Sequence, residues 1–352
     1  MAGTDSRQGF RSDAAFIRET TYGTVVAVTK KIPHLLAFLL KKSIADLPDE
    51  SLVAKRGPAA MVAGEPMVKG IIRAYHSWGE MDPFIAAAIG GSTVVSAISP
   101  YEYLYEPTDD LIKVGADTKA HSFTAVHRLE ASTNEIREYA GVKPHSWKCS
   151  GKVNAHLVDE FDCSAKARDD ASATNGDTQM NAATAIGSDR TAFLSAGSVI
   201  RLGNLDDPLV AGDNVNPGEF EFMVDNKMAE DYGSEGLQEP EPENFPGISL
   251  MLQLPRLAVT TYRTWVDSKT RLQALLQFTH PTNANIVREI RCGAMTLRDD
   301  FGGEVEGPSL IRPKLTFDLH DAETDNPTWP AMVGAYQVYL KSTQASTDPF
   351  IA

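Results

Sequence analysis

Apolar and polar positions divide the chain into short segments, most of which have the composition of β-strands. Branched and aromatic residues are frequent in these segments, and glycine-containing turns separate many of them. The strand-like segments are residues 67–75, 122–126, 135–139, 146–153, 161–167, 286–290, 294–297, 315–319 and 335–340. One stretch differs, because Asp82 is a good helix N-cap, Pro83 suits the first turn, and Gly90-Gly91 ends a helix. The pattern predicts a mainly β protein with a short helix after residue 82.

One segment of the chain occurs twice. Residues 75–90 and 262–277 align at an offset of 187, which places Tyr75 on Tyr262 and Trp78 on Trp265. Trp occurs only four times in the chain, so a Trp match within a matching Tyr-x-x-Trp frame is uncommon by chance. The period is far longer than the roughly 20–50 residues of a solenoid repeat. The match therefore indicates two related domains.

The alignment also predicts a helix in the second copy. Ser268 would cap this helix and Pro281 would end it, and its buried stripe would be Leu272, Leu275 and Leu276. The expected fold class is mainly β, with two antiparallel β-sandwich or barrel domains that each carry one short helix. The expected division is a flexible arm at residues 1–13, a first domain at 14–167, a polar linker or loop at 168–190, a second domain at 191–345 and a tail at 346–352.

Composition is that of an ordinary soluble globular protein, but the charge is unevenly placed. The chain has 352 residues and a net charge of −14, and residues 203–243 hold twelve acids and a single base, Lys227. Such a surface repels nucleic acid, although a solvated acidic loop and strand edge is the simpler interpretation. The three scattered cysteines predict no disulfide framework and fit a reducing compartment. We expect no membrane span and no export signal.

No catalytic motif is present, and we expect no catalytic, cofactor-binding or metal-binding residues. Phosphate-loop, dinucleotide-binding, zinc-protease and serine-hydrolase signatures are all missing. The nearest metal-like cluster, His145, Cys149, His156 and Cys163, has spacings that match no familiar zinc pattern, so packing on strands is favoured. A calcium-loop interpretation of Asp321, Glu323 and Asp325 lacks the glycine at the sixth position and the terminal glutamate. The alternating Tyr101, Tyr103 and Tyr105 could form a sugar-stacking platform, but they are more typical of a half-buried strand.

Several short motifs occur in an order that is informative. They are Glu19-Thr-Thr-Tyr22-Gly23-Thr24, a helix of small apolar residues within 70–89, Ser122-Phe123-Thr124, Tyr139-Ala-Gly141-Val-Lys143, and a strand that ends in Asp225-Asn226. In these motifs, over roughly residues 14–345, the chain resembles the major tail tube proteins of long-tailed bacteriophages. Single-domain members of that family are much shorter than this chain.

The resemblance implies a structural virion protein with no enzymatic activity and no cofactor. Subunits of that family join their inner sheets into a continuous β-barrel, and the rings stack into a tube through which phage DNA passes without specific binding. The implied partners are other copies of this chain and the tail tip and tail terminator proteins, with no membrane. The implied location is the virion tail after synthesis in the host cytoplasm. We expect an electronegative lumen. A duplicated tube domain would give a trimeric ring with pseudo-sixfold symmetry, and a homohexamer is the alternative.

Two other functions stay open at this point. A two-domain β module could capture a host-surface carbohydrate or another ligand through Tyr101, Tyr103, Tyr105 or the Trp residues. A hydrolase with an unrecognised site is the less favoured third possibility.

Overall fold

The computed structural model describes most of the β framework. The described residues are 12–32, 34–47, 62–76, 82–107, 121–129, 134–185, 194, 197–233, 236–254, 259–298, 314–321, 326–332 and 334–343. Twenty strands belong to one hydrogen-bonded network, and two small two-stranded ribbons stand apart from it. The predicted fold class, mainly β with antiparallel sheets, is confirmed.

The elements follow one another in two series. The first series is β1 (Asp13–Arg18), β2 (Lys30–Lys31), β3 (Leu35–Phe38), β4 (Lys41–Leu47), β5 (Val62–Tyr75), α1 (Asp82–Ile89), β6 (Gly90–Ser96), β7 (Tyr101–Pro107), β8 (Phe123–Leu129), β9 (Glu135–Lys152), β10 (Val158–Ala165), β11 (Ala167–Asp169), α2 (Asp177–Ala182) and β12 (Thr184–Ala185). The second series is β13 (Ser198–Asn204), a 3-10 turn (Ala211–Asp213), β14 (Asn214–Val215), β15 (Glu219–Asp225), β16 (Met228–Ala229), β17 (Tyr232–Gly233), β18 (Gly236–Leu237), β19 (Glu241–Pro242), β20 (Gly247–Gln253), α3 (Val259–Asp267), β21 (Leu272–His280), β22 (Asn283–Leu297), β23 (Lys314–His320) and β24 (Tyr336–Ser342).

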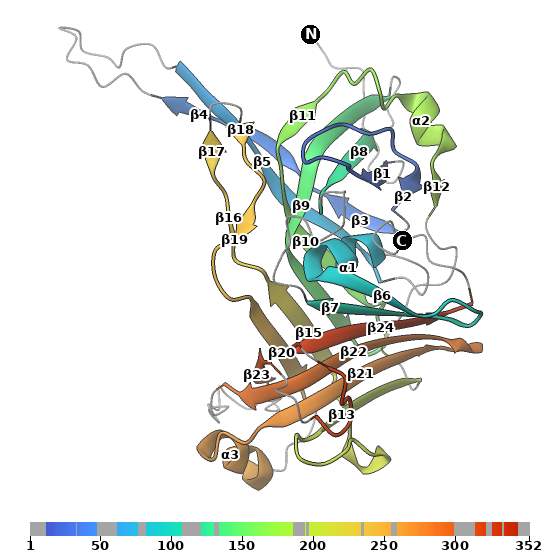
Figure 1. The fold of residues 1–352 in the computed structure, drawn as a ribbon, viewed down its shortest axis with the longest axis vertical. Helices are drawn as coiled ribbons and strands as arrows, with labels where there is room; N and C mark the ends of the chain where they lie inside the picture. Colours follow the sequence, from blue (N-terminus) through green and yellow to red (C-terminus); the bar gives the residue numbers. More distant parts are fainter. Residues whose placement is uncertain are drawn as a thin grey trace, which may run out of the picture.

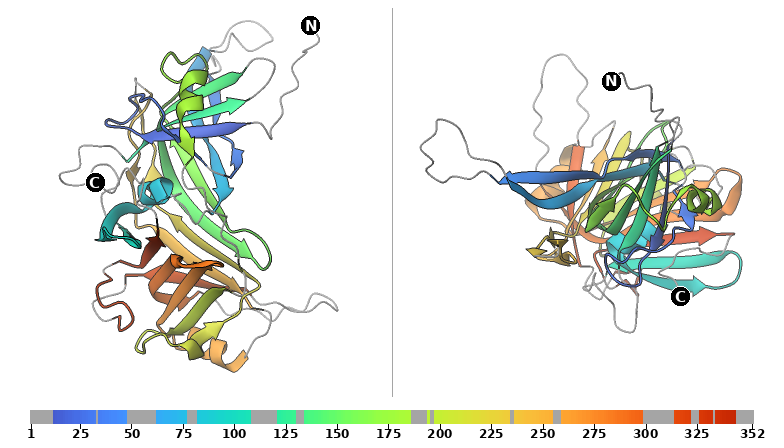
Figure 2. Two further views of the ribbon diagram at one scale, coloured as in Figure 1. Left: turned by 90° about the vertical axis from the view of Figure 1, so that its right-hand side faces the viewer. Right: turned by 90° about the horizontal axis from the view of Figure 1, so that it is seen from above.

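Eight strands from both series form one long layer that runs through the elongated molecule (Figures 1 and 2). Their order is β4, β5, β10, β9, β15, β20, β23 and β22, and every neighbouring pair is antiparallel. We call this set the eight-strand layer. Along its strands buried and partly exposed residues alternate, as in the pattern iBiBiBi of β15. One face therefore packs on the core and the other, which we call the open face, is polar.

The order of strand pairings in the first series recurs in the second. β1–β8, β4–β5, β5–β10, β10–β9, β8–β9 and β11–β9 correspond to β13–β21, β15–β20, β20–β23, β23–β22, β21–β22 and β24–β22. A helix lies between the third and fourth strand of each set, α1 in the first and α3 in the second. This recurrence covers the main strands of both halves and does not depend on any sequence match.

The same irregularity also occurs at the same place in both sets. In the first, Phe123 pairs with Val142 and Ala125 with Tyr139; in the second, Leu272 pairs with Met295 and Ala274 with Cys292. In each case, between these pairs, two residues of the long strand face one residue of its partner, which is a β-bulge. Beyond the bulge, the long strand leaves one sheet and continues into the eight-strand layer.

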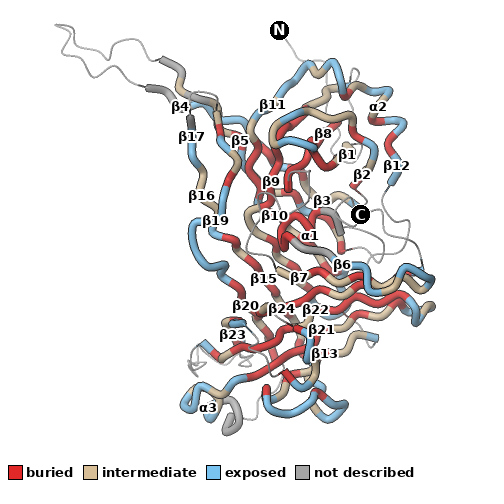
Figure 3. The backbone as a smooth tube through the Cα atoms, viewed as in Figure 1, coloured by how far each residue is buried: buried red, intermediate tan, exposed pale blue. Residues whose placement is uncertain are grey.

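Helix α1 lies within the core rather than on the surface. Its residues from Phe84 to Ile89 are all at most 2% exposed, and Figure 3 shows this stretch buried among the strands. The Phe84 ring is 4.6 Å from the Phe16 ring and 4.8 Å from the Phe123 ring, measured between centroids. A helix that is apolar on all sides is stable only when it is enclosed. The predicted first helix and its end before Gly90 are confirmed.

The predicted second helix is wrong. Residues from Leu272 to His280 form strand β21, and the helix of this region, α3, ends at Asp267 before the predicted cap Ser268. The offset of 187 therefore aligns helix α1 with a strand, and Tyr75 at the end of β5 with Tyr262 inside α3. Trp78 lies outside the described residues. β21 lies between β13 and β22 and is buried on both faces, so its apolar run lacks the alternation that usually identifies a strand.

Strand pairs also join the two predicted domains, and the expected linker is partly structured. β15 pairs with β9, β7 pairs with β24, and one hydrophobic cluster contains residues of both halves. Within residues 168–190, α2 places the buried Met180 against Val28 and Val126, and Asn175 is fully buried. Most of the expected arm and the expected tail lie outside the described residues, but Asp13 already begins β1.

We expect Leu276→Ala to lower the free energy of unfolding by about 2–5 kcal/mol, because Leu276 is fully buried in the middle of β21. Chemical denaturation of the free subunit measures this change. Leu36→Ala removes the same atoms from a side chain that is 42% exposed, and its cost should be much smaller. Equal costs for the two variants would contradict the described packing of β21.

Candidate assembly interface

The joint between the two halves of the eight-strand layer is the pairing of β9 with β15. Seven residue pairs are in register, from Glu219 opposite Lys152 to Asp225 opposite Ser146. Just beyond the strand, the Asn226 side-chain amide donates to the carbonyl of Ala88 at 2.6 Å, close to the C-terminal end of α1. The Asn226 backbone amide donates to the carbonyl of His145 at 3.0 Å. Asn226 thus ties β15, β9 and α1 together and satisfies one terminal helix carbonyl.

One end of the layer, formed by β4 and by β3, which precedes it along the same side of β5, has a different environment. Both strands pair with β5 on one side, and within the described part of the chain no strand pairs with their other side. Large apolar side chains are exposed here: Leu36 at 42%, Leu39 at 50% and Ile44 at 50%. An edge strand with exposed apolar residues is prone to pair with another chain unless something covers it.

Register makes β4 the equivalent of β15. In the first half, Lys69 of β5 pairs with Lys41 of β4 on one side and with Ser164 of β10 on the other. In the second half, Ser249 of β20 pairs in the same way with Met223 of β15 and with Asp318 of β23. Counting along the strands from these residues places Ile44 at the position of Asn226. Asn226 is only 6% exposed, because the joint covers it, whereas Ile44 is 50% exposed. The two equivalent strands therefore differ mainly in whether a neighbouring strand is present.

Three of the motifs found in the sequence meet at one buried carboxylate. Glu19 accepts hydrogen bonds from the Gly23 amide (2.8 Å), the Ser122 hydroxyl (2.7 Å), the Thr124 hydroxyl (3.0 Å) and the Gly141 amide (2.8 Å). Burial raises the pKa of Glu19, and the four hydrogen bonds oppose that rise only in part. The carboxylate links the loop after β1 to β8 and to the bulge of β9.

Both glycines at this carboxylate are required by the backbone. Gly23 has a φ of +71° and Gly141 a φ of +66°, a region that other residues rarely adopt. A Cβ on Gly23 would lie 2.4 Å from the Lys166 side chain, and one on Gly141 would lie 3.0 Å from the Tyr22 ring. The glycine that follows Tyr22 in one motif and Ala140 in the other is therefore required by the backbone and by the close packing around Glu19.

The last residue of the Tyr-x-Gly-Val-Lys motif binds the acidic segment of the second half. Lys143 has a fully buried side chain, and its ammonium lies 3.0 Å from the carboxylate of Glu239. Glu230 also contacts Lys69 of β5 and lies 3.6 Å from His145. A buried charge is stable only with a partner, so this ion pair holds the ribbon of residues 228–242 against the first half. The sequence alone did not reveal this contact.

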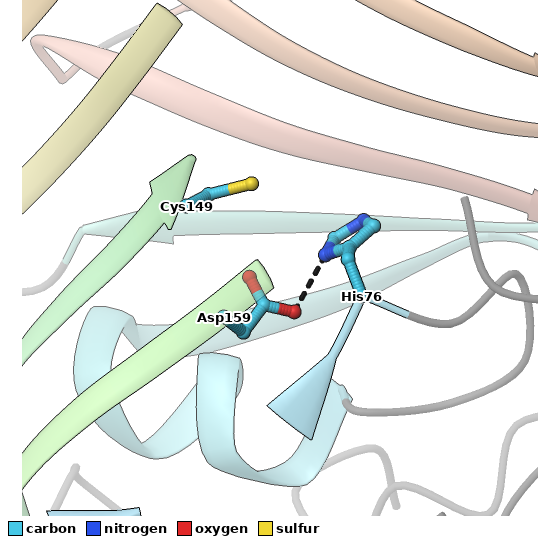
Figure 4. Close-up of side chains that lie close together, drawn as sticks. All are labelled: His76, Cys149 and Asp159. Atoms are coloured by element: carbon cyan, nitrogen blue, oxygen red, sulfur yellow. Dashed lines mark hydrogen bonds and ion pairs between the residues drawn. The ribbon is translucent and has the colours of Figure 1, made fainter. Parts of the chain in front are cut away.

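A second buried polar cluster joins β5, β9 and β10 (Figure 4). His76 Nδ1 lies 2.6 Å from Asp159 Oδ2, and Trp147 Nε1 donates to Asp159 Oδ1 at 3.0 Å. The potential ligand atoms of His76, Cys149 and Asp159 lie within 4.8 Å of one another. Two ligands on one tetrahedral zinc ion stand about 3.3 Å apart, so the 2.6 Å contact is that of a direct hydrogen bond. Burial also raises the pKa of the Cys149 thiol well above its usual range, which disfavours the thiolate that a metal needs. The cluster fits a hydrogen-bonded core better than a metal site.

The structure does not bring the metal-like residues of the sequence together. His145 bonds to Ser164 at 2.6 Å, the His156 ring packs 5.0 Å from the Tyr75 ring, and the Cys163 thiol donates to the carbonyl of Phe161. Cys149 belongs to the cluster with Asp159. Of the calcium-like residues, Glu323 and Asp325 lie outside the described part of the chain.

The tyrosine strand is not an exposed platform. Tyr103 is 4% exposed and Tyr105 is fully buried, since β7 lies between β6 and β24. Trp147 is also fully buried. Tyr103, Tyr105 and Trp147 are therefore unavailable to a carbohydrate ligand, whereas Tyr101 and Trp265 are partly exposed and Trp78 lies outside the described residues.

We expect Glu19→Gln to destabilise the subunit. The amide keeps one acceptor oxygen and places a donor against two hydrogen-bond donors, which costs about 1–3 kcal/mol for each donor left unpaired. Because burial raises the pKa of Glu19 in the folded state, the wild-type carboxyl contributes most stability below its unfolded value of 4.5, and that contribution falls as pH rises through the folded value. The deficit of the variant should therefore be larger in acid than at neutral pH. Urea denaturation at the two pH values tests this, and a deficit that grows with pH would contradict it.

Comparison with known proteins agrees with the arrangement of these motifs. None of the described helices is long and apolar enough to cross a lipid bilayer. A search of curated proteins found no match. A protein family described as phage tail tube protein matches residues 9–319, which include the loop around Glu19, the bulge of β9 and the joint between β9 and β15. Since this match spans most of the chain, the protein belongs to the phage tail tube protein family.

Proposed function

We propose that this protein is the repeating subunit of a phage tail tube, in which three chains form a closed ring and rings stack around a DNA channel. The observation that carries the ring proposal is the joint between β9 and β15. At this joint the two halves of the layer pair edge to edge, and the β4 end of the same layer has an edge of equivalent register with no strand on its outer side in the described residues.

Each chain would contribute two tube units. The recurring strand pairings support units that correspond to residues 14–167 and 191–345, with α1 and α3 as equivalent helices. The β9–β15 joint would then be the intramolecular version of the contact that closes the ring. In the assembled ring, the outer edge of β3 and β4 would receive the second unit of the neighbouring chain.

This arrangement would explain why apolar residues are exposed at that edge of the free chain. Leu36, Leu39 and Ile44 would be covered in the ring, as Asn226 and its neighbours are covered at the joint within the chain. Closed rings use one head-to-tail contact repeatedly, and covalent linkage makes every second contact intramolecular. In the virion, tail tip and tail terminator proteins would close the two ends of the tube.

We expect assembled rings to contain three chains and to show pseudo-sixfold symmetry. Mass measurement of isolated rings and image averaging of end-on views by electron microscopy both read this number. Rings of six chains would refute the trimer but would leave the tube function intact. A subunit that stays monomeric under all conditions would count against the tube function itself.

We expect Ile44→Asp to prevent polymerisation without unfolding the subunit. Ile44 is half exposed in the free chain, so the monomer tolerates a charge, whereas the closed contact would bury it. A penalty of about 1.4 kcal/mol per contact raises the subunit concentration needed for assembly about tenfold. Sedimentation and negative-stain imaging measure assembly, and thermal melting checks the fold.

The matched control is Val210→Asp, because Val210 is 57% exposed on the segment after β13, away from the edge of β4. This variant should polymerise normally. Normal tubes from Ile44→Asp would exclude the β4 edge as the ring contact.

A further inference from the structure

The open face of the eight-strand layer carries similar numbers of basic and acidic side chains. Residues that pair in register share a face of a sheet, so the described residues Lys41, Lys69, Arg73, Lys148, Lys152 and Lys314 lie on it together with the acids Glu160, Asp162, Glu219, Glu221, Asp225 and Asp318. Arg298 joins them through its hydrogen bonds to Asp318, which makes seven basic and six acidic side chains. Lys143 has the same register, but its side chain is fully buried against Glu239. The chain as a whole has a net charge of −14. The described part of this face therefore carries none of the acidic excess.

Opposite charges on this face lie beside one another on neighbouring strands. Glu160 stands between Lys148 and Arg73 in register, 3.1 Å from the Lys148 ammonium and 2.6 Å from Arg73 Nε. Partial burial opposes ionisation, but hydrogen bonds from Arg73 and Lys148 together lower the pKa of Glu160. These three charges thus form one compensated unit at neutral pH.

The same arrangement occurs farther along the layer. Glu219 of β15 is directly opposite Lys152 of β9. Arg298 Nε lies 3.1 and 3.0 Å from the two carboxylate oxygens of Asp318 on β23. Two acids of the acidic segment 203–243 form ion pairs at one end of the layer instead, Glu230 with Lys69 and Glu239 with the buried Lys143. The strongly acidic composition of that segment does not make the open face acidic.

We propose that the open face is a charge-compensated lining fitted to duplex DNA that must slide along it without being held or repelled. This inference rests on the proposed tube function, and it takes the open face, the polar face of the layer, as the one that lines the channel. Neighbouring strands are about 4.8 Å apart, and alternating charges at that spacing cancel within a Debye length of about 8 Å at physiological salt. A phosphate backbone therefore meets little net field. This proposal differs from the expected electronegative lumen, because a compensated lining would carry little net charge.

The arrangement matters because each ring repeats it. An excess of several basic groups per chain would multiply along a stacked tube into strong, salt-dependent retention of DNA. An excess of acids would raise the work needed to bring DNA into the channel. Local compensation avoids both effects while it keeps the face polar and hydrated.

The test removes acids from the open face while it leaves basic groups in place. A triple variant, Glu160→Gln, Glu219→Gln and Glu221→Gln, leaves three more basic charges uncompensated per chain. The matched control, Asp206→Asn, Asp231→Asn and Glu241→Gln, makes the same change in net charge at exposed positions on turns and on the ribbon. Negative-stain imaging first records whether each protein forms tubes. Short duplex DNA is then incubated with the tubes, and the bound fraction is measured by co-sedimentation over a salt series.

We expect wild-type and control tubes to leave the DNA in solution at every salt concentration. The triple variant should retain DNA at low salt and release it as salt rises, with a slope of log affinity against log salt of roughly −0.9 for each phosphate engaged. Salt-dependent retention by wild-type tubes, or no retention by the triple variant, would overturn the inference. If wild type forms no tubes, the tube function fails. The DNA measurement is then made on the free subunit, whose face is open, with the same expected order of binding.

Discussion

The structure depends on two long strands that each belong to two sheets. β9 pairs with β8 and β11 at its start and with β10 and β15 at its end, and β22 divides its partners in a similar way. A strand can change sheets only where its ladder is interrupted, and the interruption frees backbone groups that must find other partners. In β9, the Gly141 amide is bound by the Glu19 carboxylate, and the Ala140 carbonyl accepts the amide of Lys166. In β22, the Gly293 carbonyl accepts the Asn326 side chain and the Gly293 amide donates to the carbonyl of Ala335.

This requirement explains why short, separate motifs identified the family. Glu19, Ser122-Phe123-Thr124 and Gly141 are distant in sequence but meet at one bulge, because a buried carboxylate needs several donors and those donors lie on different elements. Their order along the chain was visible in the sequence. Their common contact was not, since no spacing rule relates residues about a hundred positions apart. In the sequence Glu19 stands between Arg18 and Thr20, so no local pattern marked it as a buried residue.

Sequence patterns predicted strands well and the second helix poorly, for a physical reason. Strands with one open face alternate, as β15 does, and such segments were recognised from their branched and aromatic residues. β21 is enclosed on both faces, so Leu272, Leu275 and Leu276 fit a helical stripe as well as a buried strand. Helix α3 (Val-Thr-Thr-Tyr-Arg-Thr-Trp-Val-Asp) has many β-branched residues, which lower helix propensity, so its sequence did not predict a helix. The Tyr-x-x-Trp match indicated a duplication but placed it in the wrong register, whereas the recurring strand pairings place α1 opposite α3.

Positions that correspond in the two sets of strand pairings are under different constraints, because one of the two edges is paired within the chain and, in the described part of the chain, the other is not. The joint between β9 and β15 is always formed, because its two strands belong to one chain, so β15 can carry Val224 and Asn226 buried against α1 and the core. In the proposed ring, the equivalent strand β4 would have to be soluble before assembly and complementary after it, and it carries Lys41 and Lys42 beside the exposed Ile44. Lysines on an edge strand disfavour pairing with an unrelated strand, while burial of an adjacent apolar residue stabilises the contact with a correctly placed partner. In a ring of single-domain subunits, every contact would need that compromise. If the proposed ring is correct, linking two units would confine the compromise to half of the contacts and leave the other half free to pack as a permanent core.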